Sequence, residues 1–124
     1  MKSTDYWPRS AKAPATPQNH FEQLRGAFHT RLRWDRARLA SLSNELQHAE
    51  GDSALIFDEL RVVAHRICGA AAVFEAPEIG TAAYTLEQAL ITAIQAHAER
   101  TDPSVSGPLD ALLDLLAATS SRNP

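Results

Sequence analysis

His65 is the residue of this chain whose type and placement best suit chemistry at an exposed position. At neutral pH an imidazole carries a free ring nitrogen, which can act as a nucleophile. Apolar residues with helical spacing surround His65 and predict a helix over residues 53–74. At 100° per residue, His65 lies roughly 170° from the centre of that apolar stripe, so we expect it to face solvent. The stripe consists of Ile56, Leu60, Val63, Ile67, Ala70, Ala71 and Phe74.

The surface predicted around His65 is small and apolar, although a solvated helix face is usually rich in charged residues. Its neighbours on that face are Arg61, Val62, Cys68, Gly69 and Ala72. Gly69 is unfavourable there, because glycine inside a helix costs about 1 kcal/mol relative to alanine. A steric reason is that a bare position lets another protein's backbone approach the imidazole. The alternative is an exposed histidine without a role beside a tolerated glycine.

The other histidines give weaker signals. His97 falls on the core stripe of the third predicted helix and is expected to be partly buried, whereas His20 and His29 have no carboxylate or cysteine cluster at ligand spacing. Glu45-x-x-His48 has the spacing used by di-iron bundles, but such a site needs a second pair and two more inward glutamates. No second pair occurs, so we expect no metal site.

The rest of the pattern predicts an all-α fold, an antiparallel up-and-down four-helix bundle. Helices are expected over residues 19–49, 53–74 and 78–100, with a fourth opening at Asp102-Pro103 or only near Ser106. Asp35 disagrees with the first stripe: either it has a buried hydrogen-bond partner, or the helix is bent or partly exposed there. The stripes of the first, third and fourth helices contain Phe21, Leu24, Phe28, Leu32, Leu39, Leu42 and Leu46; Ile79, Ala83, Leu86, Leu90, Ala93 and Ile94; and Leu109, Leu112, Leu113 and Leu116.

Three segments are expected along the chain. Residues 1–18 contain three prolines among polar residues and predict a flexible or extended N-terminal arm, which Tyr6 and Trp7 would either pin against the bundle or leave exposed. Residues 19–119 form the bundle, and residues 120–124 form a C-terminal tail.

Composition narrows the function classes. The 124 residues carry a formal charge of −3, so no basic field favours nucleic acid. Cys68 is the only cysteine, which fits a reducing compartment; we interpret it as a small filler rather than a redox nucleophile. No apolar stretch approaches a signal peptide or a membrane span. We therefore expect a soluble, cytoplasmic protein, most simply a monomer.

The segment His65-Arg66-Ile67-Cys68-Gly69-Ala70-Ala71, with Pro77-Glu78-Ile79 and Leu86-Glu87 after it, resembles the histidine phosphotransfer (HPt) domain family. The resemblance covers about residues 19 to 118. It implies that His65 is phosphorylated on Nε2, that Gly69 leaves room for a receiver domain, and that Glu87 bonds the other ring nitrogen. Glu87 as a solvated flank residue is the alternative.

The sequence departs from the family pattern at two positions. Cys68 stands where a lysine is usual, and Glu75 stands where a glycine is common after the second helix. The missing cation could be supplied by Arg61 or Arg66. The chain therefore keeps the expected acceptor but lacks the usual charge beside it.

The resemblance implies a phosphorelay carrier, which passes a phosphoryl group between His65 and the aspartates of receiver domains in two-component signalling. The chain has no glycine-rich nucleotide loop, so ATP is not the expected donor and no bound cofactor is expected. The partner receiver would supply the aspartate and the Mg²⁺, and docking would centre on Val62, Gly69 and Ala72. Two alternatives are a helical adaptor that binds receivers or other signalling partners without transfer, and an unrelated structural bundle.

Overall fold

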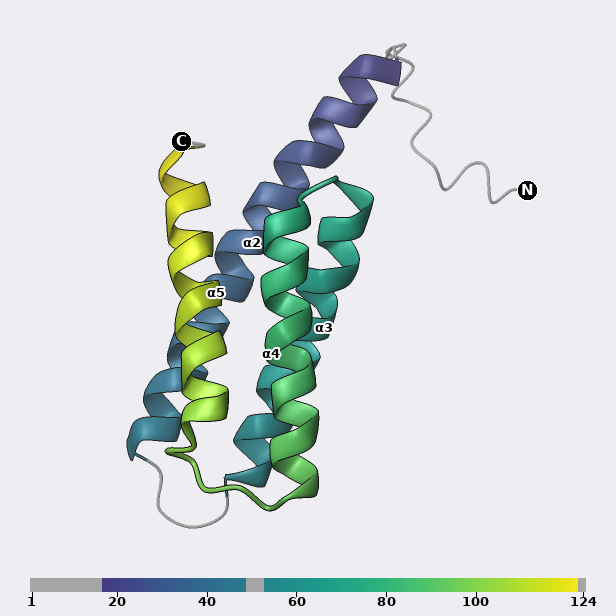
Figure 1. The fold of residues 1–124 in the computed structure, drawn as a ribbon. Helices are drawn as coiled ribbons and strands as arrows, with labels where there is room; N and C mark the ends of the chain where they lie inside the picture. The colour runs from purple at the N-terminus through teal and green to yellow at the C-terminus, as the bar shows by residue number, and fades with distance from the viewer. Residues whose placement is uncertain (1–16, 49–52, 123–124) are drawn as a thin grey trace, which may run out of the picture.

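The computed structural model describes residues 17–48 and 53–122, which form four helices. These are α2 (Pro17–His48), α3 (Ala54–Val73), α4 (Pro77–Gln95) and α5 (Pro103–Arg122). Consecutive helices run in opposite directions, and the N-terminal turns of α2 project beyond the other helices (Figure 1). The predicted up-and-down bundle is confirmed.

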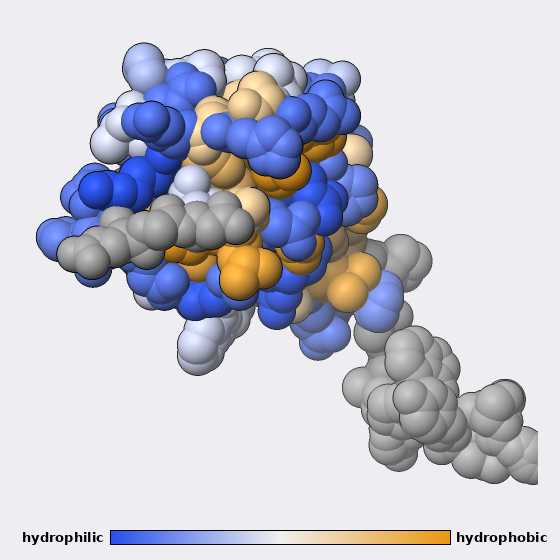
Figure 2. Space-filling model, turned by 90° about the horizontal axis from the view of Figure 1, so that it is seen from below, coloured by the Kyte–Doolittle hydropathy of each residue, from blue (hydrophilic) through white to orange (hydrophobic). Residues whose placement is uncertain are grey.

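Each helix packs against two neighbours, in the cyclic order α2, α3, α4, α5, so that within the described residues α3 and α5 lie diagonally across the core. One continuous core fills the space between the helices. Its fully buried large side chains include Leu39, Leu42, Phe57, Leu60, Ile67, Leu86, Leu90, Leu109 and Leu112. Viewed from the end at which α4 connects to α5, the surface is mostly hydrophilic with separate small apolar areas (Figure 2).

The stripe on α2 is buried only where the other helices reach it. Phe28 and Leu32 are buried, but Phe21 and Leu24 are 42% and 43% exposed on the projecting part. Phe74, at the end of α3, stacks on Phe28 with ring centroids 4.7 Å apart and lies 6.1 Å from Phe21. The N-terminal end of the predicted stripe is therefore only partly in the core.

The turn between α3 and α4 is closed by a left-handed residue. Glu75 has φ 55°, and the next amide, of Ala76, donates to the carbonyl of Ala71 at 2.9 Å. Glycine is the residue that adopts this conformation without strain. The glutamate thus stands at a left-handed position, which explains why glycine is common there in the family pattern.

Helix α4 ends five residues before the predicted boundary. His97 has φ 52° and the amide of Ala98 donates to the carbonyl of Ala93, which closes the helix in the same way. The prediction that His97 is a partly buried core residue was wrong, because the helix ends at Gln95 and leaves this side chain exposed in the turn. Arg100, which was expected to end α4, instead donates to the last carbonyls of α2, at Leu46 and Gln47.

Asp102 fixes the start of α5. The Ser104 amide donates to Asp102 Oδ1 at 2.9 Å, and this bond, followed by one from the Ser104 side chain, lowers the pKa of Asp102. The helix therefore begins at Pro103 rather than near Ser106, and it continues through Arg122.

Before α3, Ser53 occupies the cap position without a side-chain capping bond, and Asp52 lies outside the described residues.

The predicted N-terminal arm lies outside the described residues, apart from Pro17 and Gln18 at the start of α2. Within the part of the chain that the structure describes, none of the helices is both long and apolar enough to span a bilayer.

Candidate functional site

His65 lies on the outer face of α3, and its side chain is 74% exposed. The adjoining residues Ala64 and Ile67 are buried in the core. This contrast follows from the helical period, because the stripe that anchors α3 lies on the opposite side of the helix. The core therefore holds the backbone of His65 while its ring stays open to solvent.

Glu87 of α4 reaches the imidazole from the neighbouring helix. Its Oε2 lies 2.8 Å from His65 Nδ1, and the Glu87 side chain is only 12% exposed. Glu87 is therefore not a solvated flank residue here. A carboxylate accepts hydrogen bonds, so the pair favours the tautomer in which Nδ1 carries the proton and Nε2 keeps its lone pair.

Close packing of α3 and α4 brings this pair together. A Cβ on Gly80 would lie 3.3 Å from the Cβ of Ala71, which is tighter than an ordinary van der Waals contact. Gly80 precedes Glu87 by two helical turns, on the side of α4 that faces α3. Gly80 was not among the residues predicted for the site; its signal in the sequence was a glycine within a helix rich in alanine and isoleucine.

Gly69 has a different environment from Gly80. A Cβ added there would meet nothing within 4 Å. Val62 is 43% exposed, and Gly69 and Ala72 are exposed as well. The three residues predicted for docking thus form an accessible, mainly apolar surface beside His65, and the packing of the chain does not require the glycine.

Both arginines expected near His65 are bound to carboxylates. Arg61 donates through Nε and Nη2 to Asp58 Oδ1, at 3.0 and 2.8 Å. Arg66 donates to Asp35 Oδ1 of α2 at 2.9 Å. Cys68, at the position of the usual lysine, is half-buried and packs against the core.

The Arg66 bond explains why Asp35 stands in an apolar stripe. Asp35 is buried, 3% exposed, and also lies 3.5 Å from the Nε of Arg31. Of the alternatives for this position, the structure has the buried hydrogen-bond partner. The residue after His65 is thereby tied to α2, while His65 itself is tied to α4.

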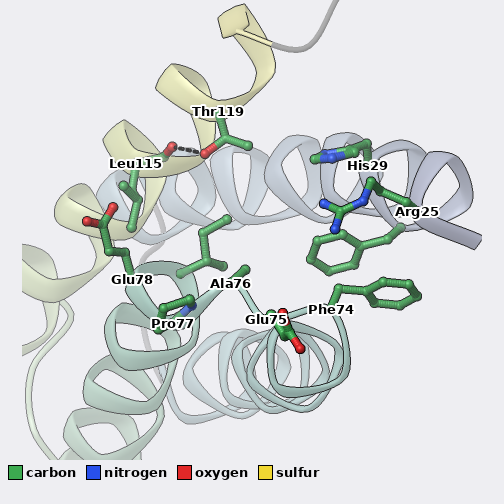
Figure 3. Close-up of a pocket in the computed structure, with 11 residues that line it drawn as sticks. Arg25, His29, Phe74, Glu75, Ala76, Pro77, Glu78, Leu115 and Thr119 are labelled. Carbon is green, nitrogen blue, oxygen red and sulfur yellow. Dashed lines mark hydrogen bonds between the residues drawn. The ribbon is translucent and has the colours of Figure 1, made fainter. Parts of the chain in front are cut away.

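A hollow of about 370 Å³ lies at the end of the bundle where α3 turns into α4. Arg25 and His29 of α2 lie across it from Glu78 and Leu115, with Phe74 and Pro77 near the turn (Figure 3). Phe74 follows His65 by nine residues, roughly 13 Å along a helix, so this hollow is separate from the histidine face. Among the described residues, no group of three or more His, Cys, Asp or Glu side chains is arranged to hold a metal ion.

The model of the Hpt domain family matches residues 19–121, which is most of the chain. Searches of curated proteins and of solved structures found no match.

Proposed function

Because the chain belongs to the Hpt domain family, we propose that it relays a phosphoryl group, with Nε2 of His65 as the acceptor atom. Membership of this family implies histidine phosphotransfer in phosphorelay signalling. We further propose a cycle with no fixed direction between receivers. An aspartyl phosphate of one receiver domain phosphorylates His65, and an aspartate of another receiver then accepts the phosphoryl group. This cycle would take place in the cytoplasm, between a monomeric carrier and its receivers.

The observation that carries the proposal is the combination of exposure and orientation at His65. The ring is 74% exposed, yet a nearly buried carboxylate of Glu87 holds its Nδ1 at 2.8 Å. A ring free to rotate would lose orientation entropy on every encounter, whereas a held ring presents Nε2 in a fixed direction. The geometry suits an in-line displacement at phosphorus by a nucleophile on a rigid helix.

In the proposed step, the Nε2 lone pair forms a bond to phosphorus as the bond from phosphorus to the receiver's carboxylate oxygen breaks. The carboxylate leaves with the bonding electrons, and no proton has to move. The imidazole ring becomes positively charged while Nδ1 keeps its proton, and the Glu87 carboxylate stabilises that charge. The partner receiver would supply the Mg²⁺.

The charge that the family places at the position of Cys68 must come from elsewhere. Arg61 is the better candidate, because residues four apart share a helix face, whereas Arg66 is rotated 100° from His65 and is bound to buried Asp35. The Arg61 partner, Asp58, is itself 55% exposed, so this pair can exchange partners at low cost. Arg61 is thus proposed to approach the phosphoryl group from the preceding turn.

The test is incubation of the chain with a panel of receiver domains charged by acetyl phosphate. We expect a label on the chain that is labile in acid and stable in base, and that is absent from His65→Gln. Glu87→Ala should slow labelling on the order of tenfold through loss of ring orientation, whereas Glu87→Gln, whose side-chain oxygen also accepts a hydrogen bond, should retain more activity. Stable complexes with receivers but no label would support the non-transferring adaptor and overturn the carrier.

A further inference from the structure

Trp34 of α2 is 70% exposed, although tryptophan carries the largest apolar surface of any side chain. A single exposed apolar residue needs no explanation. Trp34, however, belongs to a set of exposed apolar residues on α2, α3 and α4. The set also includes Val62 at 43%, Val73 at 69% and Tyr84 at 54%.

Two contacts place Trp34 at the level of His65. Trp34 immediately precedes Asp35, His65 immediately precedes Arg66, and the Asp35–Arg66 bond joins the two helices at this point. Arg38, one turn after Trp34, bonds Glu59 of α3 at 2.8 Å, so this flank of α2 faces α3. Trp34 therefore borders the histidine face on the α2 side.

Tyr84 borders the same face on the α4 side. Glu87, three residues later, reaches His65, and residues three apart lie on adjoining parts of a helix surface. The exposed imidazole thus has an accessible aromatic side chain on each neighbouring helix.

The α2 border is also positively charged. Between residues 25 and 38, α2 carries Arg25, Arg31, Arg33, Arg36 and Arg38, in a chain whose net charge is −3. Of these, Arg33 adjoins Trp34 in the sequence, and Arg31 and Arg38 lie one turn from it on the same side of the helix. The only carboxylate in that stretch is Asp35, which is buried and paired. Arg31 and Arg38, one turn on either side of Trp34, remain 55% and 47% exposed. Tryptophan and arginine are the residues that most often dominate binding energy at protein interfaces.

We propose that Trp34 and the arginines around it form the specificity contact for the receiver domain that docks over His65. The partner's matching surface is an apolar recess bordered by acidic side chains. This inference rests on the proposed function and deepens it, because it names the chemistry that separates a cognate receiver from others. Long-range attraction between the basic α2 edge and an acidic partner speeds encounter, and Trp34 supplies the short-range anchor.

The experiment compares two phosphoryl donors on wild type, Trp34→Ala and the matched control Leu55→Ala. Leu55 is also apolar, is 77% exposed on the same helix as His65, and lies ten residues before it, roughly 15 Å away. Phosphoramidate, a small donor, should label all three proteins at equal rates. Labelling by the charged receiver that is most active on wild type should slow on the order of tenfold or more for Trp34→Ala, with no change for Leu55→Ala.

The charge is tested by Arg33→Gln against Ala111→Glu, since each substitution lowers the net charge by one. Ala111 is exposed on α5, the helix diagonal to α3. Receiver-dependent labelling of wild type should slow between about 50 and 200 mM salt. Arg33→Gln should weaken that salt dependence, and Ala111→Glu should leave it closer to wild type.

The outcomes distinguish failure of the Trp34 contact from failure of the proposed phosphotransfer function on which it rests. Wild type that takes no label from any charged receiver overturns the phosphotransfer function itself. Wild type that is labelled at the same rate as Trp34→Ala overturns only the Trp34 contact. A dimer seen by analytical ultracentrifugation that Trp34→Ala dissociates also overturns it, because a second copy would then cover this surface.

Discussion

Gly69 and Gly80 show how the outer face of α3 differs from the seam between α3 and α4. In the seam, a Cβ on Gly80 would lie 3.3 Å from Ala71, so the glycine serves the packing of the chain. On the outer face, a Cβ on Gly69 would meet open space. Glycine destabilises a helix relative to alanine, and internal packing offsets this cost at Gly80 but not at Gly69. The open space at Gly69 therefore leaves room for the proposed partner on the face that carries His65, whereas the space beside Gly80 is filled by the chain itself.

The largest effect is expected from a second seam, between α2 and α3. Arg66→Ala removes the main partner of buried Asp35 and should lower the free energy of unfolding by about 2 kcal/mol, because the carboxylate is left without its strongest hydrogen bond. The remaining ion pair between Asp35 and Arg31 reduces this loss of stability. Urea unfolding measures it, with the exposed Arg33→Ala as the control.

The double variant Asp35→Leu with Arg66→Ala sharpens this test. It replaces the buried charge by an apolar side chain in the α2 stripe, so it should recover most of the lost stability. If Arg66→Ala is no less stable than Arg33→Ala, the bond contributes nothing and the α2–α3 seam depends on its apolar contacts alone.

The next effect tests the two glycines directly. Gly69→Ala should raise the free energy of unfolding by about 0.5–1 kcal/mol, as should Gly26→Ala, which also meets no atom within 4 Å. Gly80→Ala should gain less or lose stability, since the two helices must separate slightly. Gly69→Ala should also slow receiver-dependent labelling, whereas Gly26→Ala should leave it unchanged. Equal gains at Gly26 and Gly80 would remove the distinction on which the comparison rests.

A similar gain is expected at the turn that sets α4 against α3. Glu75→Gly should raise the free energy of unfolding by about 1 kcal/mol, because φ 55° strains any residue with a Cβ. Glu75→Ala is the control, because it removes the charge but keeps the Cβ. Thermal unfolding distinguishes them: an equal rise in Tm for both variants would assign the effect to the charge and not to the backbone.

The sequence was sufficient for the bundle and for the exposure of His65, because both follow from stripes at helical spacing. It was also sufficient to raise the question of Asp35, but not to answer it: Asp35 and Arg66 are 31 residues apart, and their contact depends on the packing of α2 on α3.

The end of α4 was placed too late because Ala96, His97 and Ala98 carry no glycine or proline signal. The turn there is made by a left-handed histidine, and such a backbone state depends on neighbouring contacts more than on residue type. The Glu87–His65 bond was expected only by resemblance. The close approach at Gly80 that makes it possible is a property of two packed helices, which no single helical stripe reveals.

The smallest effect concerns Asp102, at the opposite end of the bundle from the α3–α4 turn. Bonds from Ser104 lower its pKa below the ordinary value of 3.8, so folding favours the carboxylate. That stabilisation is complete above pH 3.8 and is lost as the pH falls through the lowered value. Asp102→Asn keeps a capping oxygen but cannot titrate, so its urea midpoint should fall less than that of wild type between pH 7 and pH 3. Since α5 lies diagonally across the core from α3 in the described residues, labelling of His65 at neutral pH should be unchanged. Slower labelling of His65 in Asp102→Asn would mean that the cap of α5 influences the histidine face. The conclusion that this face is independent of the packing at the far end of the bundle would then be wrong.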